Sequence, residues 1–477
     1  MKLIKNYLYN VVFQLLQIIL PLVTAPYISR VLGPNGVGKY TLSNSFASYF
    51  AILGVLGLTQ YGNRMIAYYM DDRYERSIYF WHILVLRFLT VGIAASIYFL
   101  IVFTCDMNGL ILYIIQSIVI FSTLMDVSWF FNGIENFKIT VLRNILVKLV
   151  SVLLIFLTVK DNTDLPLYAL IMVGGTFLGN ITLWPFLRNF LNTPVFSLSR
   201  FKSIFFDSVV YFVPSLATSV YLVLNKLMIG WLDSDVAAVF FQQSDQIIRV
   251  VLSVVTAMNA VMLPRISNEF KKNNNTAIMK YIGKSVHLNL FISVPIMIGI
   301  IILGSVFAPW FFGRGFEPVG SIMAIEGIMI VFIGLNNVIG WQFMMPVGMV
   351  KQMSVAVVSG ALINLFLNLT LIPIWGVIGA TVATVVSEFV VLMVMVLYTL
   401  RLVNYKALFK ESWRYVVSGV LMAVVMTSVK LFISNGTDFV FIGFVTGTVS
   451  YVVASVLFKV PFLQDLNIFI KSRYFRG

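Results

Sequence analysis

The amino-acid sequence predicts an all-α polytopic membrane protein, with about fourteen transmembrane helices in two pseudo-symmetric lobes around a central cavity. Of its 477 residues, 60% are hydrophobic and 11% are charged, a composition well outside that of soluble globular proteins. Its apolar segments have the length that a bilayer core requires. Lys and Arg concentrate in alternate connections between these segments, as the positive-inside rule describes.

The first apolar segment predicts a bent helix. It is longer than the ~20 residues that cross a bilayer core. Pro21 and Pro26 lie inside it, and each removes a backbone donor and clashes with the preceding turn. The turn that follows contains Gly33, Gly36 and Gly38. We expect the two prolines and three glycines to form a hinge, with a kinked but rigid anchor helix as the alternative.

The other spans follow from the same test of length and polarity. Several are separated by little more than a turn, so we expect no extracellular domain that could host a separate activity. The predicted spans are residues 7–32, 39–68, 77–104, 109–131, 137–159, 164–187, 204–231, 236–263, 281–308, 319–345, 350–374, 377–402, 412–433 and 438–459.

The distribution of basic residues predicts that both termini are cytoplasmic. With the N-terminus inside, 24 of the 33 Lys and Arg residues fall in cytoplasmic segments, 5 fall in outer segments and 4 lie within spans. The net charge of +14 therefore reflects membrane topology rather than a nucleic-acid surface.

The two longest polar breaks, residues 188–203 and 265–280, both lie on the predicted inner side, and the first of them divides the chain into two lobes. A weak internal similarity at an offset of 213 residues supports a repeat: Trp129–Gly133 aligns with Gln342–Pro346, and a lysine follows each segment. Many secondary transporters are built from such repeats. The predicted parts are an N-terminal lobe of helices 1–6 (1–190), a cytoplasmic linker (191–203), a C-terminal lobe of helices 7–12 (204–402), and helices 13–14 with a cytoplasmic tail (403–477).

Several kinds of chemistry are excluded by composition. The single cysteine, Cys105, cannot form an internal disulfide, and His82 and His287 are too few for a histidine metal cluster. We therefore expect no bound metal and no cofactor. The sequence has no phosphate-binding loop of the ATPase type, so transport would depend on a gradient, of protons or sodium for example, or on a partner.

Charged residues within the spans are candidate functional groups, because a charge at the bilayer centre costs about 2.5–3.5 kcal/mol on insertion scales. Asp245 and Arg249 are four residues apart and can pair on one helix face, which would also suit a purely structural ion pair. Glu326 and Glu388 have no basic neighbour in sequence. Together with Asp245 they are candidates for ion coupling, and structural hydrogen bonding is the alternative.

A second group predicts a cationic cleft that binds an anionic substrate. The first, second, seventh and eighth spans contain Arg30, Lys39, Lys226 and Arg249. In the charge balance of these spans we count Asp245 as the one acid. If the two lobes correspond, these four spans face one another, and the surplus of positive charge would attract an anion. Lys226 could instead extend its ammonium group to the membrane surface.

Four segments resemble a known family. Gly33–Tyr40, Asn44–Phe50 and Gln60–Arg64 are similar to the N-terminal signature of bacterial polysaccharide flippases, the Wzx-type O-antigen and capsule repeat-unit transporters. These belong to the multidrug/oligosaccharidyl-lipid/polysaccharide (MOP) exporter superfamily, whose fold is MATE-like. Trp129–Glu135 resembles the family's loop between helices four and five. The chain departs from the family at Phe240–Asp245, where a Tyr-x-x-Ala pattern is common.

The resemblance implies a non-enzymatic flippase of the bacterial cytoplasmic membrane. It would move undecaprenyl-pyrophosphate-linked oligosaccharides from the inner to the outer leaflet by alternating access, for capsular, exopolysaccharide or O-antigen synthesis. Membrane lipids, a polysaccharide polymerase and chain-length proteins would be its partners. The alternatives are a peptidoglycan lipid-precursor flippase and a MATE-type drug or cation antiporter. A polysaccharide polymerase would need large catalytic outer loops, and a scaffold would leave the charges within the spans unexplained.

Overall fold

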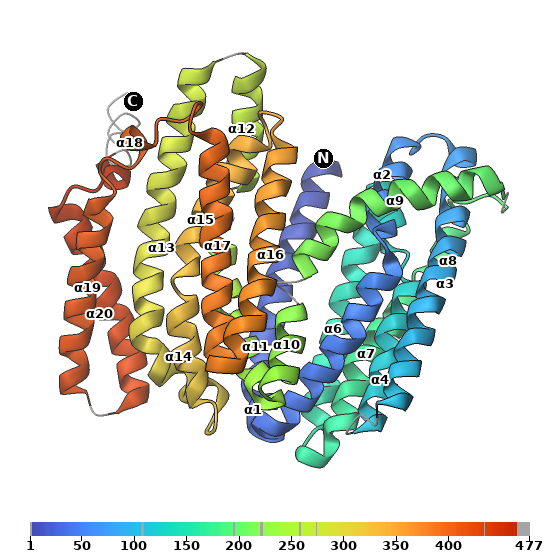
Figure 1. Cartoon of the computed structure of the whole chain (residues 1–477), viewed down its shortest axis with the longest axis horizontal. Coiled ribbons are helices and arrows are strands. Elements are labelled where there is room, and N and C mark those ends of the chain that lie inside the picture. The colour runs from blue at the N-terminus through green and yellow to red at the C-terminus, as the bar shows by residue number, and fades with distance from the viewer. Residues whose placement is uncertain are drawn as a thin grey trace. The chain divides into compact units, whose positions relative to one another are not determined.

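The computed structural model describes residues 2–105, 109–193, 196–219, 223–256, 259–272, 274–433 and 435–464. All regular secondary structure in these ranges is helical, which confirms the predicted all-α class (Figure 1). Contacts divide the chain into two compact units, residues 1–239 and 240–477, and the boundary falls inside helix α11 (Asp235–Thr256). The predicted domain limits remain a prediction.

The first unit contains the N-terminal helices and the start of α11. Helix α9 packs across α2 and α3 at one end of this unit (Figure 1). The elements are α1 (Lys2–Val55), α2 (Leu58–Tyr68), α3 (Arg73–Thr104), α4 (Leu110–Met125), α5 (Ser128–Gly133), α6 (Phe137–Thr158), the 3₁₀ turn η1 (Asn162–Asp164), α7 (Leu165–Ile181), α8 (Trp184–Leu187), α9 (Leu198–Ser219) and α10 (Asn225–Leu232).

The second unit contains the rest of α11 and the C-terminal helices. Helices α16 and α17 lie side by side, as do α19 and α20 (Figure 1). The elements are α12 (Asn259–Lys271), α13 (Asn275–Phe312), α14 (Glu317–Glu326), α15 (Met329–Asn336), the π-helix η3 (Asn337–Met344), α16 (Val350–Trp375), α17 (Val377–Thr399), α18 (Tyr405–Leu408), α19 (Trp413–Phe432) and α20 (Gly436–Leu457).

Within the described ranges, nine helices are long and apolar enough to cross a membrane. The number rises to eleven if each of two bent helix pairs counts as one span. The predicted spans 204–231 and 236–263 contain residues 220–222 and 257–258, which lie outside the described residues. The structure is compatible with fourteen spans, and that number remains a prediction.

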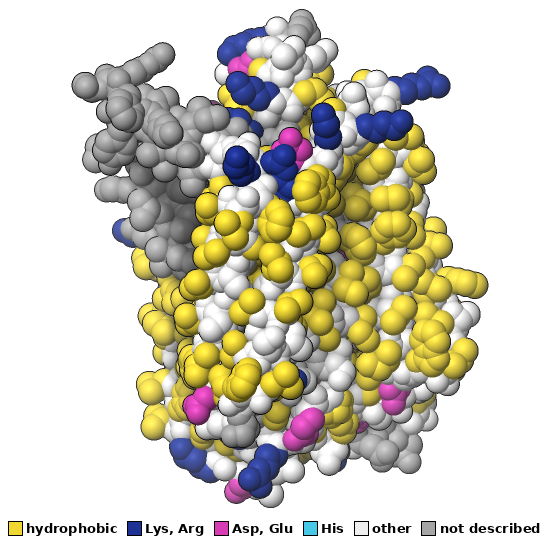
Figure 2. All heavy atoms as spheres, turned by 90° about the vertical axis from the view of Figure 1, so that its left-hand side faces the viewer, with side chains coloured by type: hydrophobic (Ala, Val, Ile, Leu, Met, Phe, Trp, Pro, Cys, Tyr) yellow, Lys and Arg dark blue, Asp and Glu magenta, His cyan; other side chains and the backbone are white. Residues whose placement is uncertain are grey.

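The α19–α20 pair presents an apolar face of the kind that contacts lipid. Side chains such as Val420, Val424, Phe444 and Val445 are more than half exposed. Figure 2 shows this face covered by hydrophobic side chains, with Lys and Arg at its upper and lower edges. In a soluble protein so much exposed apolar surface would be costly, whereas a bilayer accommodates it.

Helix α1 contains a break at Gly33, whose φ of 62° and ψ of 176° are not helical. Glycine has no Cβ and adopts this conformation without a steric penalty. Pro21 and Pro26 lie inside the helix before the break. Gly36 has a packing role, since a Cβ there would lie 2.6 Å from the side-chain oxygen of Asn162. The predicted hinge has therefore one clear backbone break, and its movement remains a prediction.

Two of the segments that carry the family resemblance pack against each other in the core of the first unit. A Cβ on Gly62 of α2 would lie 2.6 Å from the Trp129 ring, and a Cβ on Gly133 would lie 2.8 Å from Ile66. Trp129 is 1% exposed. The close approach of α2 and α5 thus needs glycine at both positions.

Candidate functional site

The second unit contains a group of buried acids at a broken membrane span. Helix α14 ends at Glu326, and α15 with η3 continues the span after a bend of 42°. The Glu326 side chain is fully buried, and its Oε2 accepts a hydrogen bond from the Ser244 hydroxyl of α11. Its Oε1 has no partner among the described residues. Coupling ions and substrates bind at such discontinuous helices in many transporters.

Helix α11 contributes an ion pair next to Ser244. Arg249 Nε donates to Asp245 Oδ2 over 2.8 Å, which confirms the predicted pairing at a spacing of four residues. The Asp245 side chain is 8% exposed and that of Arg249 is 45% exposed. Within the described part of the chain, the Nη1 and Nη2 groups of Arg249 make no hydrogen bond. The end of the guanidinium fork is therefore available to a ligand.

Helix α17 supplies the third acid. Glu388 Oε2 accepts a hydrogen bond of 3.0 Å from Asn336 Nδ2, which also donates to the Glu388 backbone oxygen over 3.2 Å. Asn336 ends α15, and the π-helix η3 starts at the next residue. π-Helical segments are rare and occur frequently at functional sites.

If all three acids were ionised, the site would have a surplus of negative charge. Arg249 interacts electrostatically with Asp245, Glu326 and Glu388. Glu326 also experiences the charge of Asp245, and the two carboxylates repel each other. One guanidinium cannot neutralise three carboxylates inside a bilayer. The arrangement therefore favours uptake of a proton or a small cation. Among the described residues, no group of three or more His, Cys, Asp or Glu could hold a metal ion.

The other predicted cations, Arg30, Lys39 and Lys226, belong to the first unit. Arg30 and Lys39 are exposed. Lys39 interacts electrostatically with Asp235, an acid that the predicted charge balance did not include. Gly38 packs closely against Asp235, since a Cβ on Gly38 would lie 2.9 Å from the Asp235 backbone oxygen. The grouping of these three cations with Arg249 in one cleft remains a prediction.

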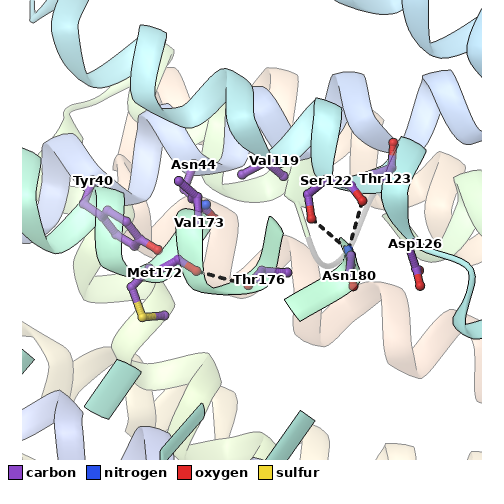
Figure 3. Close-up of a pocket in the computed structure, with 10 residues that line it drawn as sticks. All are labelled: Tyr40, Asn44, Val119, Ser122, Thr123, Asp126, Met172, Val173, Thr176 and Asn180. Atoms are coloured by element: carbon purple, nitrogen blue, oxygen red, sulfur yellow. Dashed lines mark hydrogen bonds between the residues drawn. The ribbon is translucent and has the colours of Figure 1, made fainter. Parts of the chain in front are cut away.

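A polar pocket of about 400 Å³ lies within the first unit, between α1, α4 and α7 (Figure 3). Asn180 of α7 points toward α4 and donates to both the backbone oxygen and the hydroxyl of Ser122, each over 2.9 Å. Arg143 Nη1 donates to Asn180 Oδ1 over 2.9 Å. Asn44 donates to Gln116 over 3.0 Å. These hydrogen bonds of Asn180 and Asn44 join α7 to α4 and α1 to α4.

Arg87 of α3 supports the same region. It is 2% exposed, and its Nη1 donates to the backbone oxygen of Asp126 over 2.8 Å while Nη2 donates to Thr59 Oγ1 over 3.0 Å. Its Nε has no partner among the described residues. A carbonyl and a hydroxyl therefore bind this cation, and it joins α3 to the start of α2 and the end of α4.

Solved structures show which fold this chain shares. A structure of the lipid II flippase MurJ in an inward closed conformation aligns with a TM-score of 0.74 at 16% identity, over 95% of this chain and 98% of that one. An inward-facing MATE family multidrug resistance transporter of the MOP superfamily aligns with a TM-score of 0.63 at 15% identity, over 83% and 96%. The chain has the fold of MOP-superfamily transporters.

Sequence comparison identifies the family. The model of the family described as "Polysaccharide biosynthesis protein" matches residues 3–270, more than half of the chain. A protein of Escherichia coli (strain K12) named "Putative O-antigen transporter" is 22% identical over 404 residues, which are 83% of this chain and 96% of that protein. The chain belongs to the polysaccharide biosynthesis protein family. The relatives are named as transporters and flippases rather than enzymes, in agreement with the prediction.

Proposed function

We propose that this protein is a flippase that moves undecaprenyl-pyrophosphate-linked oligosaccharides from the inner to the outer leaflet of the bacterial cytoplasmic membrane. Its product would supply capsular, exopolysaccharide or O-antigen synthesis. The observation that carries the proposal is the family match over residues 3–270, in a chain with the MOP transporter fold. The N- and C-termini would be cytoplasmic, and a polysaccharide polymerase and chain-length proteins would be its partners.

Arg249 is the residue that we propose for binding the pyrophosphate in the second unit. Its Nε is held by Asp245, so the planar fork has a fixed position. Its Nη1 and Nη2 groups, on a side chain that is 45% exposed, can bind two phosphate oxygens in parallel, which a lysine cannot do. Arg30, Lys39 and Lys226 would supply positive charge from the first unit.

The same geometry suggests how substrate and proton could be coupled. When a phosphate binds the Arg249 fork, the guanidinium neutralises the neighbouring acids less fully. Asp245, Glu326 or Glu388 would then take up a proton, because an uncompensated carboxylate is costly in a bilayer. Release of the substrate would return the guanidinium to the acids and release the proton.

Two single variants test this coupling. Glu326→Gln and Glu388→Gln each keep the shape and hydrogen-bonding capacity of the side chain but cannot exchange a proton. In proteoliposomes with an imposed pH gradient, we expect at least one variant to bind substrate and to lose the dependence of flipping on that gradient. Unchanged pH dependence in both variants and in the double variant would reject a role for these acids.

A peptidoglycan lipid-precursor flippase is the second candidate, because the MurJ structure aligns over nearly the whole chain. A drug or cation antiporter is favoured less, since the MATE structure aligns with a lower TM-score. A strain lacking the protein separates these possibilities. We expect lipid-linked oligosaccharide to accumulate in the inner leaflet, while the peptidoglycan precursor still reaches the outer leaflet. The reverse result would favour the second candidate.

A further inference from the structure

A hollow lined by tyrosines lies in the first unit, outside the site described above. It has a volume of about 470 Å³, within the range of ~300–1,000 Å³ that is usual for small-molecule sites. Its walls come from α2, α3 and α9. The tyrosine cup, as we name it, is formed by the rings of Tyr61, Tyr68, Tyr79 and Tyr211.

The rings of the cup contact one another or the neighbouring Tyr69, so they form an aromatic surface. Tyr61 and Tyr211 meet edge to face with their centroids 5.9 Å apart. Tyr69, next to the cup, stacks on Tyr79 at 5.1 Å and contacts Tyr68 at 4.9 Å. Tyr68 is 77% exposed at the rim, whereas Tyr61 is 5% exposed. A ligand entering the cup would therefore meet fixed aromatic edges and faces.

Two charged groups lie in the wall of the cup and are held by its tyrosines. Arg64 Nη1 donates to the Tyr211 hydroxyl oxygen. The Tyr61 hydroxyl donates to Asp207 Oδ2 over 3.5 Å, and Ser203 donates to the same oxygen over 3.3 Å. The cup thus presents a guanidinium and a carboxylate beside its rings, both oriented by neighbouring hydroxyl groups.

We propose that the tyrosine cup binds the sugar part of the lipid-linked substrate. A pyranose ring has C–H faces, which pack on the negative face of an aromatic ring, and hydroxyl groups, which pair with both donors and acceptors. A cup with tyrosine rings, one guanidinium and one carboxylate offers each of these contacts. Asp207 gives the cup an acceptor for sugar hydroxyl groups, and a site for an acyl chain would need no charged groups. The inference rests on the proposed function and assigns its sugar-binding region.

The test compares two lipids on the same purified protein in nanodiscs. One is the lipid-linked oligosaccharide extracted from the source cells, and the other is undecaprenyl pyrophosphate without sugar. We expect Tyr68→Leu to weaken binding of the glycosylated lipid by roughly 2- to 12-fold and to leave binding of the bare lipid unchanged. Tyr68→Phe, which keeps the ring, should bind both lipids as the wild type does. Because Tyr68 is 77% exposed, neither change should disturb folding.

Tyr74→Leu is the matched control, since this tyrosine is also exposed, at 54%, and does not line the cup. Asp207→Asn is a second variant within the cup, with the same expected selective loss. If Tyr68→Leu weakens both lipids equally, or weakens neither, the sugar-binding role is overturned. If the wild-type protein flips the glycosylated lipid and Tyr68→Leu still binds that lipid as tightly as the wild type does, only this inference is rejected. A wild-type protein that neither binds nor flips that lipid rejects the proposed function as well.

Discussion

The ion pair on α11 yields the most specific prediction. We expect Arg249→Gln to stop flipping and to destabilise the second unit. The double variant Asp245→Asn with Arg249→Gln should recover the stability but not the flipping. The reason is that Arg249 has two roles in our account: its Nε neutralises a carboxylate that is 8% exposed, and its fork binds the substrate. The double variant removes the unpaired charge but does not restore the fork.

The magnitude follows from the burial of the two partners. Removing one partner of a fully buried ion pair costs about 3–5 kcal/mol. Arg249 is 45% exposed, so solvent screens the pair, and we expect a loss of about 1–3 kcal/mol for Arg249→Gln. The double variant should lie within ~1 kcal/mol of the wild type. Loss of one charge-assisted contact to phosphate, ~1.5–3 kcal/mol, corresponds to roughly 10- to 150-fold weaker substrate binding.

Thermal unfolding in detergent and flipping in proteoliposomes measure the two roles separately. Arg249→Lys should restore part of the flipping, because a point charge replaces a two-pronged contact. Wild-type flipping by the double variant, at wild-type expression, would show that Arg249 only neutralises Asp245. A stable Arg249→Gln single variant would show that the acid does not depend on this arginine.

Three further variants test other parts of the account. Replacing Pro21 and Pro26 together by Ala should stiffen α1 and slow flipping without unfolding the protein, because proline disfavours a helix interior; unchanged flipping rates would remove the two prolines from the mechanism. Gly62→Ala should lower the unfolding temperature by overpacking the Trp129 ring, at about 1–3 kcal/mol, and an unchanged unfolding temperature would contradict the close contact. Glu326→Asp, which shortens the side chain bound by a buried hydroxyl, should reduce flipping and shift its pH profile; a profile identical to that of the wild type would argue for a structural role.

Composition and hydropathy are sufficient to predict the helical membrane fold, because bilayer thickness limits the length and polarity of each span. The Asp245–Arg249 pair is also predictable, since residues four apart share a helix face. The positions of the helix breaks are harder to predict. The predicted hinge contained two prolines and three glycines, and the sequence did not indicate that Gly33 would be the non-helical residue of α1. A glycine's positive φ depends on the packing of the chain on both sides.

The full acidic group could not be derived from sequence because it depends on how α11, α14 and α17 pack. Glu326 and Glu388 have no basic neighbour along the chain, yet both interact with Arg249 in the fold. Ser244 and Asn336 were missed, although polar side chains within apolar spans are themselves a signal. The tyrosine cup was missed as well, because its rings come from three helices that are brought together only by the fold.

Direct flipping by the purified protein is the measurement that tests the central claim. The protein would be reconstituted in liposomes that carry the lipid-linked oligosaccharide of the source cells, and a glycan-modifying reagent outside the vesicles would report the accessible fraction. We predict that nearly all of the lipid becomes accessible with active protein, while about half stays protected in protein-free vesicles and in vesicles with the Arg249→Gln variant. Equal protection with and without the wild-type protein would contradict the assignment of this chain as a flippase.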